Sequence, residues 1–229
     1  MKFCVIGLGH FGQNLALNLA QMGAEVMALD MKEENVGFVQ DAVSYAAVLN
    51  AADPASLKML PLHEMDAVIV AIGDNFEDSL LTTAYLQEIG VKRVITRVIN
   101  PVHEKLLKLM KVHDLILPEE IAGQRLAKSL IYTGILGSYE IGKGHGVAEI
   151  KCPEKLAGKS LIDSELRKRY QLILITIKRM ADADSTAVHI GTDETDEVMG
   201  VVDPNYVFQE NDVLVVFGTD KAIRNFSGQ

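Results

Sequence analysis

The sequence is poor in cysteine, tryptophan and positive charge. Its 229 residues include two cysteines and no tryptophan. Cys4 and Cys152 cannot build the disulfide framework of a small secreted domain, and they match no metal-ligand spacing, so a reducing compartment is expected. Lys and Arg number 22 against 31 Asp and Glu, which gives a net charge of −9. Nucleic acid is therefore not expected as a partner, because binding phosphate backbones needs a basic surface.

Long apolar runs are also missing. The first run, Phe3 to Leu8, is too short for the core of a signal peptide, and nowhere do about eighteen apolar residues follow one another. We therefore expect a cytoplasmic chain that reaches a membrane only through a partner. With 48% apolar and 23% charged residues the composition is that of a globular protein, and the length fits one large domain or a medium and a small one.

The first ~130 residues alternate between short Val- and Ile-rich runs and segments with helical spacing of apolar residues. This alternation predicts a Rossmann-like, doubly wound parallel sheet of α/β class. Helices are expected to begin near Gly9, Lys32, Ala55, Asn75, Pro101 and Glu119. The strands are expected at Lys2–Ile6, Glu25–Leu29, Ser44–Val48, Ala67–Ala71, Arg93–Thr96 and Asp114–Leu117.

The pattern changes near residue 135, so we expect one domain over 1–134 and a small α+β domain over 135–229. The stretch 134–146 holds five glycines and is interpreted as a linker or hinge. Beyond it we expect strands at Val147–Lys151, Leu172–Lys178, Tyr206–Phe208 and Val213–Phe217, with helices at Ile162–Arg169 and from Thr219 or Asp220. The acidic segment Met180–Val202 is expected to be an extended surface hairpin or a disordered loop.

The clearest chemical signal is the glycine loop Gly7-Leu-Gly-His-Phe-Gly12. It follows a strand and opens a helix, and the next strand ends in Asp30, which completes a dinucleotide-binding fingerprint. Gly7 permits a tight turn, Gly9 lets the backbone approach phosphate, and Gly12 lets the helix pack close to the strand. The helix N-terminus favours anions, with His10 and Phe11 beside it. A carboxylate at Asp30 suits ribose hydroxyls and disfavours NADP.

Two further loops are expected at the same edge of the sheet. The first contributes Asn50, Ala51 and Asp53 after the third strand, and the second contributes Ala71, Gly73 and Asn75 after the fourth. The fingerprint specifies adenosine, ribose and phosphates but nothing beyond them. ATP, ADP, AMP and NAD or NADH all remain open as ligands.

No reaction centre is visible beside this pocket. Tyr139 and Lys143 match the Tyr-x-x-x-Lys spacing of short-chain dehydrogenases, but they lie in the glycine-rich stretch, where no helix would bring them together. No Cys–His or Ser–His–Asp arrangement is indicated either. A nucleotide pocket with no proton donor and an added small domain favours a sensor over an enzyme, with an NAD-dependent oxidoreductase as the alternative.

The order of motifs resembles the RCK family, the regulators of potassium conductance. The resemblance rests on 3–12, on 68–75, on Leu117-Pro-Glu119, on 150–177 and on 209–218, and so spans nearly the whole chain. It implies a non-enzymatic cytosolic subunit that gates a Ktr- or Trk-type potassium uptake channel by changing shape with its nucleotide. A regulator of a different membrane transporter is the other alternative.

The resemblance also implies an assembly and further ligands. Dimers would join into an eight-membered ring beneath a membrane potassium-translocating subunit at the inner face of the cell membrane. Glu119 would hold a divalent cation, Mg²⁺ or Ca²⁺, near the nucleotide, and Arg167 and Pro204 would contact cyclic di-AMP in the second domain. Family members usually carry Arg where this chain has His10, which leaves the preferred nucleotide open.

Overall fold

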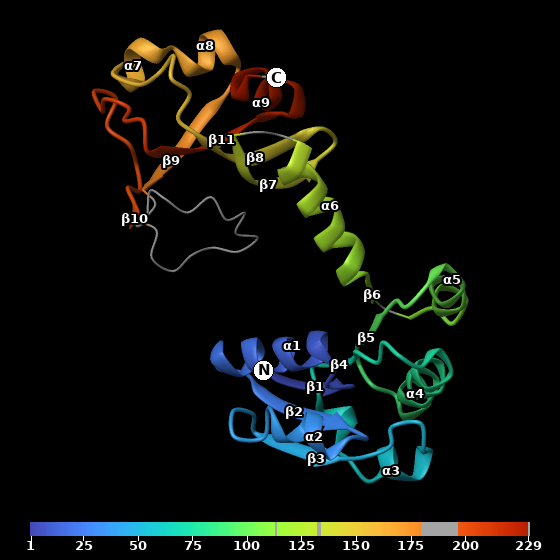
Figure 1. Cartoon of the computed structure of the whole chain (residues 1–229). Helices are drawn as coiled ribbons and strands as arrows, with labels where there is room; N and C mark the ends of the chain where they lie inside the picture. Colours follow the sequence, from blue (N-terminus) through green and yellow to red (C-terminus); the bar gives the residue numbers. More distant parts are fainter. Residues whose placement is uncertain (113, 132–133, 180–196, 229) are drawn as a thin grey trace. The chain divides into compact units, whose positions relative to one another are not determined.

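A computed structural model describes residues 1–112, 114–131, 134–179 and 197–228 (Figure 1). The chain divides into two compact units, residues 1–119 and 120–229. Among the described residues no helix is long and apolar enough to cross a bilayer. The acidic segment expected over 180–202 lies, up to residue 196, outside the described residues.

The first unit is built on a six-stranded parallel sheet with the order β3-β2-β1-β4-β5-β6. The chain runs from β1 outward to β3, returns to β4 beside β1, and continues to β6, so the strand order reverses between β1 and β4. The predicted doubly wound sheet is confirmed. Its strands are β1 Lys2–Ile6, β2 Glu25–Asp30, β3 Tyr45–Val48, β4 Ala67–Val70, β5 Val94–Arg97 and β6 Asp114–Ile116.

The connecting helices begin and end where local chemistry expects. The Asn75 side chain caps α4 by accepting hydrogen bonds from the N–H groups of Glu77 and Asp78, and Gly90 ends it in the left-handed conformation. Pro101 opens α5, where its missing N–H costs nothing. The helices are α1 His10–Gln21, α2 Glu33–Gly37, α3 Pro54–Lys58, the short 3-10 helix η1 Leu62–Glu64, α4 Phe76–Ile89, α5 Pro101–Leu109 and α6 Pro118–Ile131.

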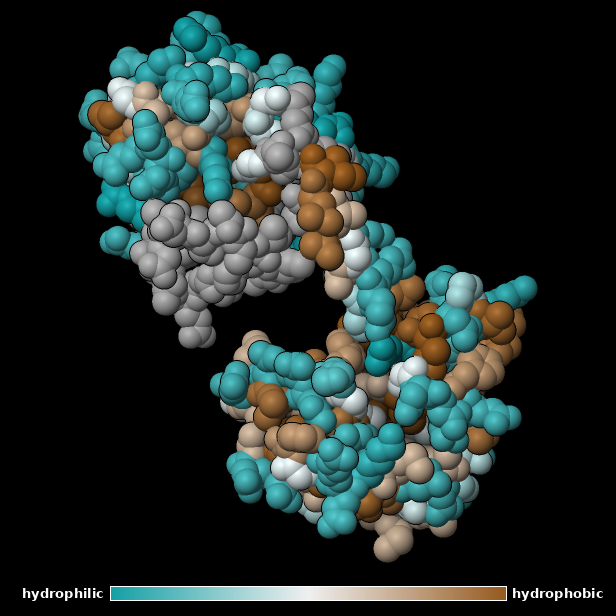
Figure 2. All heavy atoms as spheres, viewed as in Figure 1, coloured by the Kyte–Doolittle hydropathy of each residue, from teal (hydrophilic) through white to brown (hydrophobic). Residues whose placement is uncertain are grey.

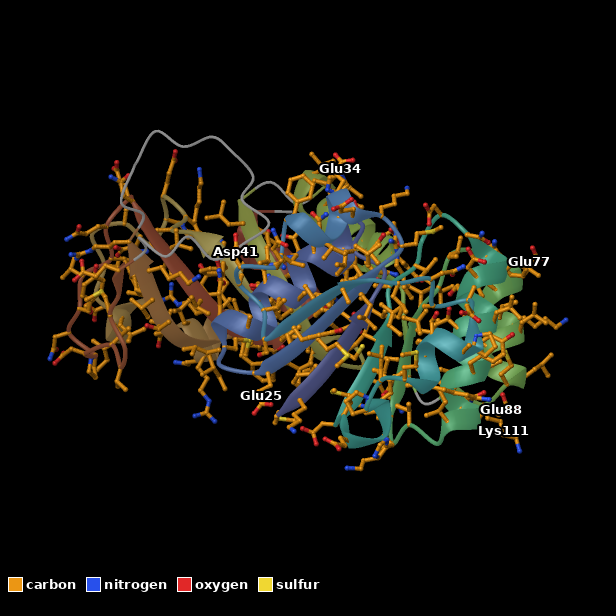
Figure 3. All side chains as sticks on the ribbon, turned by 90° about the horizontal axis from the view of Figure 1, so that it is seen from below. Glu25, Glu34, Asp41, Glu77, Glu88 and Lys111 are labelled. Atoms are coloured by element: carbon orange, nitrogen blue, oxygen red, sulfur yellow. The ribbon has the colours of Figure 1, made fainter. Side chains whose placement is uncertain are left out.

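Alternating strand residues feed two apolar layers on opposite faces of this sheet. In β1, Cys4 and Ile6 pack into the layer under α3, η1 and α4, whereas Val5 packs into the layer under α1 and α2. Burial on both faces fits the run of apolar residues in each strand. The excess acidic side chains stay outside, as Figure 3 shows for the exposed Glu25, Glu34, Asp41, Glu77 and Glu88.

The second unit is a five-stranded antiparallel sheet with the order β10-β9-β11-β8-β7. Its core includes Ile150, Leu172, Leu214 and Phe226, which join the strands to α8 and α9. The predicted small α+β architecture is confirmed. The elements are β7 Ile135–Gly142, β8 His145–Lys151, α7 Leu161–Ser164, α8 Leu166–Tyr170, β9 Ile173–Arg179, β10 Glu197–Val198, β11 Asp212–Thr219 and α9 Asp220–Ser227.

The expected glycine-rich linker was wrong, because most of it is strand β7, paired with β8. One of its glycines, Gly146, allows close backbone packing. A Cβ at Gly146 would lie 2.7 Å from the carbonyl oxygen of Tyr139. The register shifts between Ile135 and Gly137 and between Glu140 and Gly142 mark bulges, where glycine is favoured.

Two other predicted elements of the second unit also differ. The helix expected over 162–169 is split into α7 and α8 at Glu165, which adopts a left-handed backbone with φ of 46°. The strand expected at Tyr206–Phe208 is a loop with a single isolated bridge between Ser160 and Val207. Its backbone groups bond the neighbouring loop, with Phe208 N–H donating to the Lys159 carbonyl.

Each unit buries one cysteine. Cys4 is fully buried in the first unit, and burial raises the pKa of its thiol far above the usual value. Burial and the nearby Asp212 and Glu210 raise the pKa of Cys152 to about 11. On the face shown in Figure 2, the coloured surface of each unit is mostly hydrophilic with scattered apolar patches.

Candidate functional site

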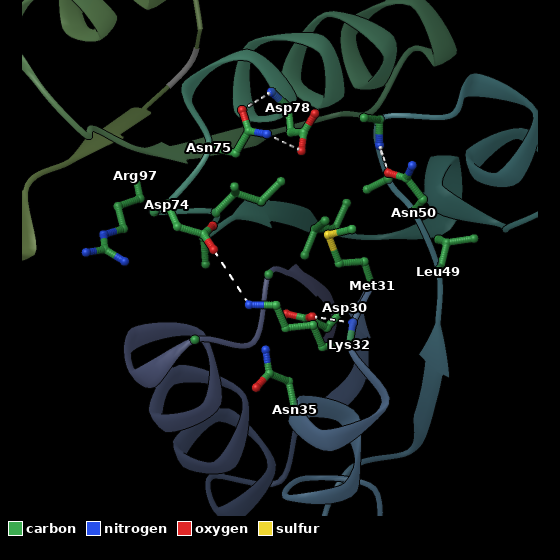
Figure 4. Close-up of a pocket in the computed structure, with 18 residues that line it drawn as sticks. Asp30, Met31, Lys32, Asn35, Leu49, Asn50, Asp74, Asn75, Asp78 and Arg97 are labelled. Atoms are coloured by element: carbon green, nitrogen blue, oxygen red, sulfur yellow. Dashed lines mark hydrogen bonds and ion pairs between the residues drawn. The ribbon is translucent and has the colours of Figure 1, made fainter.

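A cleft of about 580 Å³ opens at the carboxyl ends of the parallel strands (Figure 4). It lies where the strand order reverses between β1 and β4, the place where open α/β sheets bind ligands. Its walls come from the ends of β1, β2, β4 and β5 and from the loops that follow β1, β2, β3 and β4. The lining residues are Ile6, Gly7, Gly9, Asp30, Met31, Lys32, Asn35, Leu49, Asn50, Ala51, Ala52, Ala71, Ile72, Gly73, Asp74, Asn75, Asp78 and Arg97.

The glycine loop forms one wall by the geometry that its spacing predicts. Gly7 has a φ of 92°, a conformation that other residues rarely adopt, and a Cβ there would meet the backbone of Ile72 at 2.8 Å. A Cβ at Gly12 would lie 1.9 Å from the carbonyl oxygen of Gly7, so only glycine lets α1 start this close to β1.

The N-terminus of α1 is the part of this loop that suits an anion. Gly9 caps α1 without a side chain, and its Cβ position is open, so a ligand can approach the backbone there. Gly7 and Gly9 line the cleft. His10, Phe11 and Gly12 do not, and His10 is exposed on the first turn of α1.

Asp30, at the end of β2, is a buried polar side chain of the cleft. It is 9% exposed, and its Oδ2 accepts a hydrogen bond from the N–H of Leu8 at 2.6 Å. Its Oδ1 accepts from the N–H of Lys32 at 2.8 Å. The carboxylate thus fixes the glycine loop and the loop after β2, while each oxygen keeps a lone pair for a ligand hydroxyl.

Polar groups on the loop after β4 form the opposite wall. Asp74 Oδ2 lies 3.9 Å from Lys32 Nζ, so an ion pair crosses the cleft (Figure 4). Asn75 donates to Asp78 Oδ2 at 2.7 Å while its own oxygen caps α4. The sequence pointed to Asn75 but missed Asp74 in the same loop, Asp78 in the first turn of α4 and Lys32 at the N-terminus of α2.

The loop after β3 places Asn50 and Ala51 in the cleft but not Asp53. Asn50 Oδ1 accepts from the N–H of Ala52 at 3.0 Å, which shapes the loop. Asp53 instead caps α3, and hydrogen bonds from the Ser56 hydroxyl and the Ala55 N–H lower its pKa. Its side chain is exposed and outside the cleft lining, so the geometry assigns it the role of a helix cap.

Arg97 is a further cleft residue that sequence reasoning missed. It is the last residue of β5, the strand next to β4, and it lines the cleft. Its Nη2 is hydrogen-bonded to Glu119 Oε1 and its guanidinium carbon lies 5.9 Å from the centre of the Phe11 ring. The available signal was its place at a strand's carboxyl end, where Ala71 and Asp30 were already expected to face the ligand.

The cleft combines the groups that an adenosine phosphate needs. Met31, Leu49, Ala51 and Ile72 offer apolar surface for a base. Asp30 offers acceptors for ribose hydroxyls, and the α1 N-terminus, Lys32 and Arg97 offer positive charge for phosphates. Tyr139 and Lys143, the one dehydrogenase-like pair, lie in and after β7 in the second unit, outside the cleft lining.

The other predicted ligand sites are less complete. Among the described residues no three carboxylates, imidazoles or thiols gather as a metal site requires, and the Glu119 carboxylate is paired with Arg97. A cation at Glu119 would therefore need ligands from outside the described residues of this chain. Arg167, on α8, lines a shallow hollow of about 370 Å³. Pro204 is not part of that hollow, and its carbonyl accepts from the N–H of Ile162.

Comparisons with known proteins agree over nearly the whole chain. The model of the TrkA-N domain matches residues 3–118. The Ktr system potassium uptake protein C of Bacillus subtilis is 32% identical over 98% of this chain and 95% of its own length. The Ktr system potassium uptake protein A of the same organism is 30% identical over 100% of this chain and 96% of its own.

A solved structure shares the fold at low sequence identity. The GsuK channel bound to NAD superposes with a TM-score of 0.65 at 16% identity. The match covers 100% of this chain but 39% of the channel chain, so this chain corresponds to a part of that protein.

Proposed function

Since the chain belongs to the family of Ktr and Trk potassium uptake proteins with a TrkA-N domain, we propose that it is the nucleotide-sensing subunit of a potassium uptake system. The resemblance to RCK proteins expected from the motifs is confirmed by these relatives. The observation that carries the proposal is the cleft itself, with the glycine loop and Asp30 in one wall and Arg97 in another. In this proposal the cleft binds its ligand as a signal and does not transform it.

The proposed ligand is an adenine nucleotide, ATP or ADP, or else NAD or NADH. The positive charge of Lys32, Arg97 and the α1 N-terminus supports phosphates, and the carboxylate of Asp30 supports an unmodified ribose. The structural neighbour GsuK has been solved bound to NAD, which supports a dinucleotide as the ligand. Arg167 and Pro204 are proposed as contacts of a second nucleotide, cyclic di-AMP.

The proposed mechanism is a shift between two conformations of an assembly. A nucleotide shifts such an equilibrium only by its difference in affinity for the two states. A coupling of about 1–3 kcal/mol per site, summed over the sites of a ring, is enough to open or close a pore. In this proposal residues 1–134 act as the nucleotide module and 135–229 as the second domain.

The proposed partner is a membrane potassium-translocating subunit, and the proposed location is the cytoplasmic face of the membrane. The names of the relatives, potassium uptake proteins of Ktr systems, support this choice of transporter. The chain would assemble as homodimers and then as an octameric ring. Co-purification of the tagged chain with a membrane potassium-translocating subunit tests the partner, and recovery of a proton antiporter instead would point to a different transporter.

Calorimetric titration of the purified chain with ATP, ADP, NAD and NADH tests the nucleotide signal. Unequal affinities are expected, because a sensor must distinguish the members of a pair. Equal affinity for all four, or binding of none, would remove the proposed switch. Steady consumption of NADH with a panel of small carbonyl compounds would instead support the oxidoreductase alternative.

A further inference from the structure

We propose that Arg97 senses the terminal phosphate of the ligand, and that ligand binding transfers its guanidinium from Glu119 to that phosphate. The inference rests on the proposed function, because it assigns a specificity residue to the same cleft. In this proposal, binding of a ligand in the cleft changes the contacts of α6, whose first turn contains Glu119.

The Arg97 side chain is held at the cleft but does not use all its donors. It is 20% exposed, and its Nε is buried with no hydrogen-bond partner among the described residues. Its Nη1 lies against Gly73, where a Cβ would come within 2.3 Å, so the absence of a side chain at Gly73 leaves the guanidinium its place in the cleft wall. A guanidinium has five N–H donors in a planar fork, and the bond to Glu119 uses Nη2.

The charges around the cleft make phosphate the ligand group that Arg97 suits. The acidic side chains of the lining are Asp30, Asp74 and Asp78, and Lys32 is already paired with Asp74. Arg97 lies on β5, on the far side of β4 from Asp30, so it is separated from the ribose side of the cleft. A guanidinium binds phosphate through two parallel hydrogen bonds, which an ammonium group cannot do.

The ion pair between Arg97 and Glu119 is weak enough for a phosphate to replace it. The Glu119 side chain is 65% exposed, and ion pairs with one exposed member contribute little because water screens them and solvates the released group. Once released, the carboxylate lies on the first turn of α6, where the helix N-terminus stabilises negative charge. Desolvated phosphate–guanidinium bonds therefore replace a weak surface pair.

The exchange removes the hydrogen bond that ties the first turn of α6 to the end of β5. Pro118 opens α6 and the helix continues to Ile131, so it carries the chain from the first unit into the second. A ligand that lacks a phosphate in reach of Arg97 would leave the tie intact. Nucleotides with different phosphate chains would then differ in their effect on α6 although they share the same adenosine contacts.

Matched charge-removing substitutions test the exchange. Arg97→Gln and Glu119→Gln are compared with Arg93→Gln and Glu120→Gln, which remove the Arg93–Asp114 ion pair and a neighbouring α6 carboxylate outside the cleft. Affinities for adenosine, ADP and ATP are measured by calorimetry, and the fold of each variant is checked by circular dichroism. Arg97→Lys keeps the charge without the fork and is expected to lie between wild type and Arg97→Gln.

We expect Arg97→Gln to weaken binding of the preferred phosphorylated nucleotide at least tenfold and to leave adenosine binding within about twofold. Glu119→Gln is expected to strengthen nucleotide binding severalfold, because it removes the competing carboxylate. The controls are expected to match wild type. Equal losses for adenosine and nucleotide in Arg97→Gln, or weaker nucleotide binding in Glu119→Gln, would overturn the exchange and leave Arg97–Glu119 a structural tie.

Amide hydrogen exchange gives a second measurement. A purely structural Arg97–Glu119 pair would not make exchange at the start of α6 depend on nucleotide. Nucleotide is expected to accelerate exchange over 119–124 in wild type and to have no such effect in Arg97→Gln. Unchanged exchange in nucleotide-saturated wild type would contradict the transfer. A wild-type chain that binds no nucleotide would overturn the proposed function itself, whereas binding without dependence on Arg97 would overturn only this inference.

Discussion

The N–H group of Leu8 donates a hydrogen bond to Oδ2 of Asp30 across 2.6 Å, and this bond ties the glycine loop to the end of β2. Asp30, which is expected from its position to bind ribose, therefore also holds the glycine loop in place. Its two roles can be separated, because one affects the stability of the folded chain and the other affects ligand affinity.

Asp30→Ala is expected to lower the free energy of unfolding by about 1–3 kcal/mol, since the N–H groups of Leu8 and Lys32 lose their acceptor. It is also expected to weaken adenine nucleotide binding by on the order of 1–3 kcal/mol. Urea denaturation and calorimetry measure the two effects. The exposed Asp41→Ala serves as the control, and unchanged nucleotide affinity in Asp30→Ala would place the ribose elsewhere.

Gly12→Ala is expected to destabilise the first unit by about 1–3 kcal/mol or more, because the new methyl group would overlap the Gly7 carbonyl. Thermal unfolding followed by circular dichroism measures the loss. Gly123→Ala, in the middle of α6 with open space around it, should raise helix stability by about 0.5–1 kcal/mol. If Gly12→Ala and Gly123→Ala were equally stable, this result would argue against the close packing of α1 on β1.

Acidification is expected to destabilise the first unit through His103. The side chain is fully buried, its Nδ1 accepts from the N–H of Ile99 at 3.2 Å, and burial lowers its pKa below 6.5. The unfolded chain therefore takes up a proton near pH 6.5, whereas the folded chain does so only at lower pH. Stability is thus lost as the pH falls below about 6.5.

Urea denaturation of wild type and His103→Gln between pH 7.5 and 5 tests this linkage. The variant is expected to lose less stability than wild type over that range, although it starts from a lower value. The exposed His63→Gln should keep the wild-type slope. The same pH slope in all three proteins would show that His103 does not titrate differently on folding.

Lys178→Met is expected to destabilise the second unit by on the order of 2 kcal/mol, because it leaves the Glu149 carboxylate without its partner at 2.7 Å. Both side chains of this pair are less than one fifth exposed, at 14% and 19%. Lys168→Met breaks a pair on the surface and should change stability by less than about 1 kcal/mol. Chemical denaturation of both variants measures the contrast, and equal effects would contradict the role of burial.

The parallel sheet could be predicted because each strand is a short apolar run between helix signals. Local rules also predicted the start of α4 near Asn75, whose side chain caps the helix. The antiparallel unit was harder, since glycine indicates both flexible linkers and close strand pairing. Only the pairing of β7 with β8 in the folded structure shows that Gly146 lies against the Tyr139 carbonyl.

The site was predictable where a residue serves the turn that contains it, as Gly7 does, or ends the second strand, as Asp30 does. Arg97 and Lys32 were missed because their place in the cleft depends on which loops lie together in the folded structure. Asp53 was predicted to face the ligand, whereas its side chain caps α3 and is not among the residues that line the cleft. Sequence spacing identifies the edge of the sheet, and tertiary packing decides which side chains reach the ligand.

The two thiols offer a built-in pair of reporters. Only a thiolate reacts with an alkylating reagent, and both cysteines are buried with raised pKa values, so the folded chain should resist labelling. Cys4 belongs to the parallel sheet and Cys152 follows β8 in the antiparallel one. Peptide mass analysis after timed alkylation would therefore reveal which unit unfolds first and exposes its cysteine, with no engineered label.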